Sequence, residues 1–273
     1  MTVAIAYLQP GSIDIHFKVC LDRVKHYDRL HGQLIGAEIP VTTGSGGIAA
    51  GRNGAVAFFL EHCDRDEWLW FVDSDMGFAP DTIEALVATA DPKERPIVGG
   101  LAFCQMAASP ELDELGVPVG GHWYAPTIYM YNEEVGMPQS MSDYPRDSLI
   151  QCYATGAACL LIHRSVFEKM AESYPGPHSW FDRKIINGEE WSEDIVFCAR
   201  ANTCGFPLIV DTSIKTSHKK DHYLTEETVG DKCGKPIKLP AEYVPPLKYA
   251  QPELNREARR RKQGPRDASM GRR

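Results

Sequence analysis

The chain has 273 residues, of which 43% are hydrophobic and 24% charged, and its formal net charge is −8 at pH 7. This length supports a full core and favours one large domain of ordinary globular composition. The acidic balance argues against a protein that coats nucleic acid, and no apolar run approaches the length of a membrane span. The eight cysteines form no Cys-x-x-Cys pair. We therefore expect reduced, mostly buried thiols rather than zinc sites or disulfides.

Strands and helices alternate through the first hundred residues. The expected strands are short apolar runs, at residues 3–8, 37–43, 68–72 and 97–103. The expected helices have helix-spaced apolar residues and comprise 16–30, 48–63 and a third helix that begins at Pro80-Asp81. Strands that alternate with helices in this way are typical of βαβ units and a largely parallel sheet.

The pattern changes after residue 103. Residues 121–132 predict an extended segment suited to antiparallel pairing, and residues 149–154 and 158–163 predict strands interrupted at Thr155-Gly156. A helix over 164–172, a helix from about Ser192 with that serine as N-cap, and a last strand over 208–211 complete the expected elements. From His218 onward the sequence is polar and rich in proline, and beyond Tyr249 we expect no regular structure.

Asp73 and Asp75 follow the aromatic run Trp68–Val72, where a central strand would stop. Residues two apart in an extended chain point the same way, so the two carboxylates are expected to converge at the carboxyl end of the strand. Open α/β sheets bind their ligands at this edge, and converging carboxylates favour a divalent cation. The alternative is an ordinary Asp/Ser turn, since the tripeptide is common.

Arg52 lies on the apolar stripe of the second expected helix, just after a glycine-rich loop. A charged residue on an inward face needs a partner. One interpretation is a structural salt bridge, for which Asp73 is a candidate. The other is contact with a nucleotide phosphate or base, and the sequence favours neither.

Glu193 and Asp194 open the last expected helix behind Ser192. Acidic residues are common in a first helical turn because they complement the helix dipole. The functional alternative is a general base or an acceptor for a substrate hydroxyl. The nearby aromatic residues Trp180, Phe181 and Trp191 suit the apolar faces of sugar rings, although most tryptophans serve core packing.

His218 lies in a lysine-rich stretch a few residues beyond the last expected strand. A histidine in such a place is most often a surface residue. Imidazole is also a ligand for manganese-like cations beside carboxylates, and the neighbouring lysines could neutralise a diphosphate.

Taken in order, several of these motifs resemble one protein family. They are Ala50-Gly51-Arg52-Asn53, Phe71-Val72-Asp73-Ser74-Asp75-Met76 with Pro80, Thr155 to Ile162 with Arg164, Ser192-Glu193-Asp194 with Phe197, Arg200 and Gly205, then Asp211 and His218. The set is similar to nucleotide-sugar-dependent glycosyltransferases of the A-type fold, especially family-2-like members from phage and bacteria. The likeness covers roughly residues 3 to 218. A Gln-x-x-Arg-Trp motif of processive synthases is lacking, which fits transfer of a single sugar better than polymerisation.

The resemblance implies a single Rossmann-like α/β domain with a mostly parallel central sheet and a small antiparallel segment. We expect this domain over residues 1–248, with a nucleotide-binding half (1–103), an acceptor and catalytic half (104–218) and a C-terminal extension (219–248). A basic tail (249–273) follows, expected to be disordered. The resemblance also implies a bacterial or phage-infected cytoplasm as the location, and the start of the sequence shows no charged leader typical of a signal peptide.

The resemblance further implies the roles of individual residues. Asp73 would lie near the ribose and the metal, Asp75 and His218 would ligate a manganese or magnesium ion, and Pro10 and Arg52 would contact the nucleotide. Asp194, or else Glu193, would be the catalytic base if the reaction inverts the anomeric carbon; in a retaining enzyme the pair would position substrate. Gly156 and Trp191 would face the sugars. The sequence leaves the oligomeric state open.

The expected activity is metal-dependent transfer of one sugar from a nucleoside-diphosphate sugar to an acceptor hydroxyl. A hydroxymethylated base in phage DNA is one candidate acceptor, suggested by the arginine-rich tail and by Lys215, Lys219, Lys220 and Lys232. A glycan, a protein or a small molecule is the alternative acceptor. A nucleotidyltransferase of related fold is a rival, although the short uncharged Gln9-Pro10-Gly11 lacks the basic phosphate loop it would need. A carbohydrate-binding protein without activity is the second rival.

Overall fold

The computed structural model describes residues 1–9, 13–44, 46–106, 123–220 and 223–224. Expectations for Pro10, for Lys232 and for the basic tail therefore lie outside the described residues. The division into domain halves stays a prediction.

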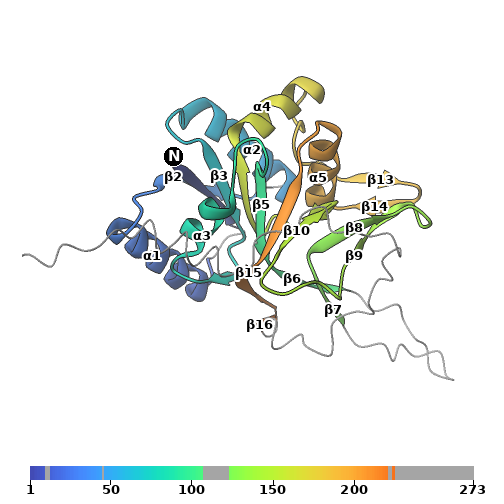
Figure 1. Cartoon of the computed structure of the whole chain (residues 1–273). Coiled ribbons are helices and arrows are strands. Elements are labelled where there is room, and N and C mark those ends of the chain that lie inside the picture. Colours follow the sequence, from blue (N-terminus) through green and yellow to red (C-terminus); the bar gives the residue numbers. More distant parts are fainter. Residues whose placement is uncertain (10–12, 45, 107–122, 221–222, 225–273) are drawn as a thin grey trace, which may run out of the picture.

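A mixed sheet forms the centre of the molecule (Figure 1). Its main path runs β10 (Leu149–Cys152), β15 (Leu208–Lys219), β5 (Ile97–Leu101), β12 (Cys159–His163), β3 (Trp68–Val72), β1 (Val3–Gln9) and β2 (Ile35–Thr42). Strands β1, β2, β3, β5 and β15 share one direction, while β10 and β12 run against them. The expected α/β fold with a mostly parallel sheet is confirmed.

Helices cover both faces of this sheet. They are α1 (Ile15–Leu30), α2 (Gly47–His62), α3 (Thr82–Thr89), α4 (Arg164–Ser173) and α5 (Glu193–Thr203). The buried residues of α1 and α3 pack with Trp68 and Trp70 of β3, whereas those of α2, α4 and α5 pack with Leu69 and Phe71. The alternation along β3 therefore separates two apolar layers, and all five expected helices form near their expected bounds.

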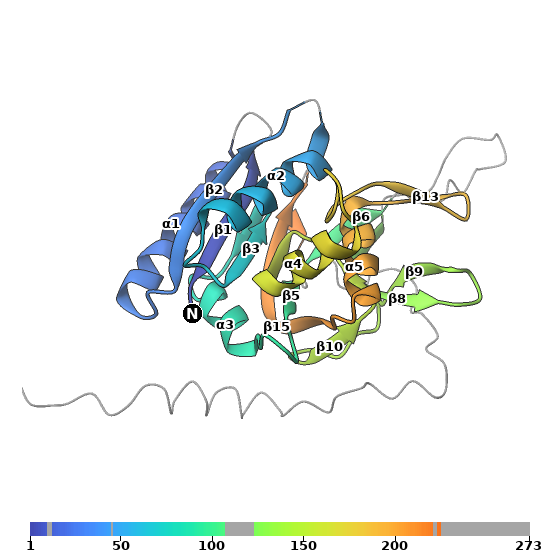
Figure 2. The ribbon, with the colours of Figure 1, turned by 90° about the horizontal axis from the view of Figure 1, so that it is seen from above.

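Smaller antiparallel pairings surround the carboxyl edge. β6 (Phe103–Met106) pairs with β7 (Trp123–Pro126), and β8 (Ile128–Asn132) pairs with β9 (Met137–Ser140) and β11 (Ala154–Thr155). β13 (Lys184–Ile186) and β14 (Glu189–Trp191) form a separate hairpin. The antiparallel pairing expected within 121–132 is confirmed for its described part. Figures 1 and 2 show the β8–β9 and β13–β14 hairpins extending on the same side of the molecule.

The last long strand extends beyond its expected end at Asp211. β15 continues to Lys219, with a shift in register between Asp211 and Lys215, and pairs with β4 (Met76–Phe78) and β16 (Tyr223–Leu224). Its later half is polar, yet the buried Thr212 and Thr216 satisfy their hydroxyl groups on the carbonyls of Pro145 and Leu101. The placement of His218 after the strand was therefore wrong, because hydrogen-bonded threonines can occupy a buried strand face.

Candidate functional site

Arg52 joins three elements at the carboxyl end of β3. Its side chain extends from the first turns of α2 and is only 3% exposed. Nη2 donates to Asp73 Oδ1 at 2.9 Å, just beyond β3, and Nη1 donates to Glu193 Oε1 at 2.6 Å, in the first turn of α5. Burial alone would lower the pKa of Arg52, but the charges of Asp73, Asp194 and Glu193 outweigh it and raise that pKa. The guanidinium is thus the positive centre of an acidic cluster.

This geometry bears on both interpretations of Arg52. The salt bridge to Asp73 is present, and Glu193 is a second partner that the sequence did not indicate. Glu193 is itself buried, at 6% exposed. A carboxylate that a buried arginine holds in this way is poorly placed to remove a proton, and the role of Asp194 as a base stays a prediction. Nucleotide contact by Arg52 stays a prediction.

Asp73 and Asp75 bind different partners. The chain turns directly after β3, where the Met76 N–H donates to the Asp73 carbonyl at 3.0 Å. Asp73 therefore faces Arg52, whereas Asp75 Oδ2 faces His218 Nε2 at 3.1 Å. The premise of an extended chain through both aspartates was wrong, because the turn ends the alternation of side chains.

Asp75 and His218 form the second polar centre, brought together by the pairing of β4 with β15. His218 Nδ1 lies 2.8 Å from the Phe103 carbonyl, which can only accept a hydrogen bond, so Nδ1 carries a proton. The other ring nitrogen, Nε2, faces Asp75. Burial alone would raise the pKa of Asp75, but the hydrogen bond and charge of His218 and the charge of Lys220 lower it.

The lysines expected around His218 form ion pairs with different carboxylates. Lys220 Nζ lies 3.5 Å from Asp75 Oδ2. Lys219 pairs with Asp14, and Lys215 lies 3.8 Å from Asp147. Lys220 is consequently the lysine that adds positive charge beside Asp75.

Asp194 lies in the first turn of α5 and is partly buried. Its Oδ1 accepts the hydroxyl of Ser192 and the N–H of Ile195, the latter at 2.9 Å. Ser192 occupies the N-cap position but makes no side-chain capping bond, because its hydroxyl binds Asp194 instead. A Cβ added to Gly156 would lie 3.6 Å from Asp194 Oδ2. Gly156 therefore borders this oxygen, and the carboxylate is held from one side.

Two residues near Asp194 were missed by sequence reasoning. The Cys104 thiol on β6 and the Tyr129 hydroxyl on β8 lie 3.5 Å apart. Burial raises the pKa of both groups, and the charge of Asp194 adds to the rise in each. They belong to strands that meet only in the folded chain, so no spacing in the sequence signals them.

The aromatic residues considered for sugar contact have different surroundings. Trp180 donates its indole N–H to the Phe167 carbonyl at 2.8 Å, and Phe181 stacks on Phe197 with ring centroids 4.7 Å apart, so both serve the core. Trp191 is 6% exposed and meets Tyr153 edge to face. Trp191 thus stays the candidate for sugar contact.

The donor set fits a divalent cation in part. Within the described residues, no group of three or more His, Cys, Asp or Glu side chains is placed to hold a metal. Asp75 and His218 supply one carboxylate oxygen and one imidazole nitrogen, and Asp73 is turned toward Arg52. Magnesium-like ions are often held by one or two protein ligands together with substrate phosphates. The pair fits such an ion, whereas the described part of the chain offers no set of three ligands.

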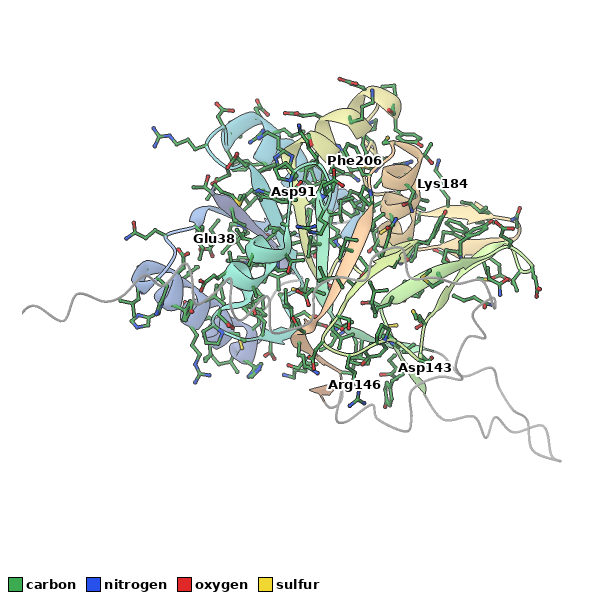
Figure 3. The ribbon with its side chains drawn as sticks, in the orientation of Figure 1. Glu38, Asp91, Asp143, Arg146, Lys184 and Phe206 are labelled. Atoms are coloured by element: carbon green, nitrogen blue, oxygen red, sulfur yellow. The ribbon has the colours of Figure 1, made fainter. Side chains whose placement is uncertain are left out.

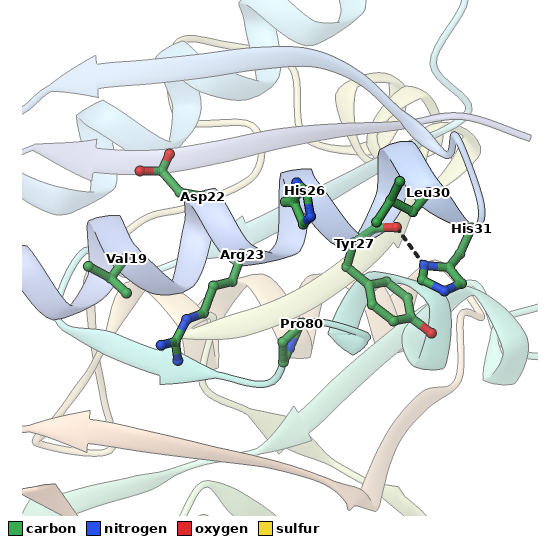
Figure 4. Close-up of a pocket in the computed structure, with 8 residues that line it drawn as sticks. All are labelled: Val19, Asp22, Arg23, His26, Tyr27, Leu30, His31 and Pro80. Atoms are coloured by element: carbon green, nitrogen blue, oxygen red, sulfur yellow. Dashed lines mark hydrogen bonds between the residues drawn. The ribbon is translucent and has the colours of Figure 1, made fainter.

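A hollow on the surface lies away from the site residues described above. It follows α1 beside Pro80 and is lined by side chains such as Val19, Tyr27 and Leu30 (Figure 4). None of the acidic and histidine residues described above lines it.

Among the described helices, none combines the length and the apolar composition of a membrane span.

Comparisons with known proteins find similarity in structure. No family model and no curated protein matches the sequence. A protein from STIV is 16% identical, with a TM-score of 0.48 over 92% of this chain and 100% of the other. Drosophila β1,4-galactosyltransferase 7 with xylobiose is 14% identical, with a TM-score of 0.41 over 93% of this chain and 79% of the other. GalNAc-T7 with UDP, GalNAc and Mn²⁺ is 12% identical, with a TM-score of 0.44 over 80% of this chain and 43% of the other. At these identities and TM-scores, the similarities assign neither a substrate nor an activity to this chain.

Proposed function

We propose that this protein is a metal-dependent glycosyltransferase that moves one sugar from a nucleoside-diphosphate sugar to an acceptor hydroxyl. The observation that carries the proposal is the Asp75–His218 pair at the carboxyl edge of the sheet. His218 presents Nε2 because Phe103 binds Nδ1, and Lys220 stands beside the carboxylate. A carboxylate, an imidazole nitrogen and a lysine together suit a cation with a diphosphate.

On the donor side, Asp75 and His218 would hold the cation, and Lys220 would bind a phosphate oxygen. When bound, a divalent cation supplies neutralisation of the charge that develops on the leaving diphosphate. Arg52 keeps Asp73 and Glu193 paired within the acidic cluster. Asp73 carries a second oxygen, Oδ2, for the ribose, which is the role that the sequence resemblance implies for it.

On the acceptor side, Asp194 is the proposed base. Its carboxylate accepts the proton of the acceptor hydroxyl while that oxygen bonds to the anomeric carbon, and the diphosphate leaves with the electrons of the broken bond. This step inverts the anomeric carbon. Ser192 and Ile195 bind Oδ1, which fixes the carboxylate and leaves Oδ2 beside Gly156 for the proton.

The rivals differ in what they release. A nucleotidyltransferase would release pyrophosphate from a nucleoside triphosphate and a sugar 1-phosphate, and a binding protein without activity would release nothing. The test is incubation with a panel of nucleotide sugars, Mn²⁺ and mixed acceptors, scored for nucleoside diphosphate. A parallel incubation with nucleoside triphosphates and sugar 1-phosphates is scored for pyrophosphate. Release of a nucleoside diphosphate that requires Mn²⁺ supports the proposal. Pyrophosphate, or no release from any donor of the panel, contradicts it.

The candidate acceptors include a hydroxymethylated base in phage DNA, for which the support is the arginine-rich sequence after Tyr249. The ammonium group of Lys220 lies beside the Asp75 carboxylate, whereas those of Lys215 and Lys219 pair with Asp147 and Asp14. This arrangement weakens the idea of a basic rim around the site. A glycan, protein or small-molecule acceptor is the alternative.

A further inference from the structure

The β8–β9 and β13–β14 hairpins leave the body of the molecule on the same side (Figures 1 and 2). Their turns lie close together, because a Cβ added to Gly136 would lie 3.4 Å from Asn187 Nδ2. Large apolar side chains are exposed on both: Tyr131 at 42%, Val135 at 53% and Ile185 at 78%. Together the two hairpins form a surface with three exposed large apolar groups. We call residues 128–140 and 184–191 the hairpin surface.

A row of aromatic rings connects this surface to the proposed base. The ring centroids of Tyr131 and Tyr153 are 4.9 Å apart, and those of Tyr153 and Trp191 are 6.5 Å apart. Exposure falls along the row, from the exposed Tyr131 through the partly buried Tyr153 to Trp191 at 6%. Trp191 directly precedes Ser192, Glu193 and Asp194 in the sequence. The row therefore runs from solvent to the start of α5.

The charge of the hairpin surface limits what can bind there. It carries Glu133, Glu134, Glu189 and Glu190 against Lys184, which begins β13 (Figure 3). A nucleic acid would be repelled by this acidic balance. Neutral sugar rings have apolar C–H faces that pack on exposed aromatic rings. They also carry hydroxyl groups that can donate hydrogen bonds to glutamates.

We propose that the hairpin surface binds a neutral oligosaccharide acceptor, with Tyr131 and Tyr153 as the residues that determine acceptor specificity. This inference rests on the proposed function and names the class of its acceptor. The saccharide chain lies along the aromatic row, and its terminal sugar reaches Asp194 beside Trp191. Tyr129, two residues before Tyr131 on the same face of β8, lines the inner end of this path with Cys104.

The test uses the full chain and measures binding without turnover. Chitotriose, cellotriose, maltotriose and a short DNA duplex are titrated into the protein and followed by ligand-observed NMR. We expect at least one trisaccharide to bind and the duplex not to compete with it. Tyr131→Ala should weaken trisaccharide binding about two- to tenfold, because it removes one stacking contact. Tyr131→Phe keeps the ring and should bind the trisaccharide as wild type does.

A matched control is available on α2. Phe58 is 46% exposed and stacks edge to face on His62, far in sequence from both hairpins. Phe58→Ala should leave trisaccharide binding unchanged. The inference is overturned if no trisaccharide binds, if Tyr131→Ala binds as well as wild type, or if the duplex binds and Tyr131→Ala weakens it.

A parallel titration separates this inference from the proposed function. Wild-type protein is titrated with the nucleotide-sugar panel in the presence of Mn²⁺. Donor binding without trisaccharide binding overturns the acceptor class and leaves the transferase proposal standing. Trisaccharide binding without binding of any donor contradicts the transferase and with it the role of the surface as an acceptor site.

Discussion

His218 Nε2 lies 3.1 Å from Asp75 Oδ2, and the position of its ring is fixed from the other side by the Phe103 carbonyl, 2.8 Å from Nδ1. The imidazole therefore joins the turn before β4 to the start of β6. A carboxylate oxygen and a ring nitrogen are thus placed where both can reach one bound ion.

The first prediction concerns the cation. Asp75→Ala should abolish Mn²⁺-dependent donor binding, measured by calorimetry, because it removes the carboxylate of the pair. The fold should persist, since Asp75 is partly exposed beyond the end of β3. Asp81→Ala is the matched control, because Asp81 precedes α3 and makes no side-chain capping bond. Full turnover in excess chelator would contradict the prediction.

The second prediction concerns acid stability. The pKa of Asp75 is lowered in the folded protein, so its stabilising effect is present above its ordinary pKa of about 3.9 and is lost as the pH falls through the lower folded value. Asp75→Asn should therefore lower the free energy of unfolding at pH 7, by a small amount because the side chain is 41% exposed. Urea unfolding should show that the difference in the free energy of unfolding between wild type and Asp75→Asn becomes smaller well below about pH 4. If this difference is the same at low pH as at pH 7, the ionised carboxylate does not contribute to stability.

The third prediction concerns the base. Asp194→Asn keeps the size of the side chain but cannot accept the acceptor proton. Turnover should fall about a hundred- to ten-thousand-fold, while the donor dissociation constant stays nearly the same. Steady-state kinetics and donor titration measure the two effects. If Asp194→Asn is fully active and Glu193→Gln is inactive, the roles of the two carboxylates are exchanged.

The fourth prediction concerns the buried ion pairs of Arg52. Arg52→Ala removes the arginine that binds Asp73 and the buried Glu193, whose other oxygen lies 3.7 Å from Arg183 Nε. The free energy of unfolding should fall by about 3–5 kcal/mol, measured with urea. Lys169→Ala is the comparison, because Lys169 and Glu172 form an exposed pair 2.9 Å apart on α4, and its loss should cost less than about 1 kcal/mol. Equal losses would show that Arg52 does not act through its buried partners.

The fifth prediction concerns the arginine-rich sequence after Tyr249. If that segment serves a DNA acceptor, binding to duplex DNA should weaken steeply as salt rises and should be lost when the chain ends at Tyr249. Fluorescence anisotropy at several salt concentrations measures this. Absence of salt-sensitive binding by the full chain would exclude DNA as the acceptor.

Much of the fold could be predicted because its patterns are local. The apolar run at β3 and the spacing of α1 and α2 each follow from burial against one sheet. The second half of β15 could not be predicted, because polar residues such as Thr212 and Thr216 are typical of loops. They can be buried in a strand here because carbonyl groups from other parts of the chain accept hydrogen bonds from their hydroxyl groups. The turn at Asp73 could not be predicted either, because the sequence Asp73-Ser74-Asp75 is compatible with both a strand end and a turn.

The site could be predicted as a set of residues but not as contacts. Asp73, Asp75, Asp194 and His218 were indicated by their positions at the ends of elements. The pairing of Arg52 with Glu193 spans 141 positions and depends on how α2 and α5 pack. Cys104 and Tyr129 approach across two different small sheets, so their meeting is a property of the tertiary structure.

The pairing of β4 with β15 joins Asp75 to a histidine 143 positions later in the chain. During synthesis the first half emerges from the ribosome and can begin to fold long before His218 is available. A nascent or truncated chain that ends before β15 would carry Asp75 with no partner. Metal-dependent protection from proteolysis would then appear only once the chain has passed Lys219, which makes the cation a reporter of completed folding.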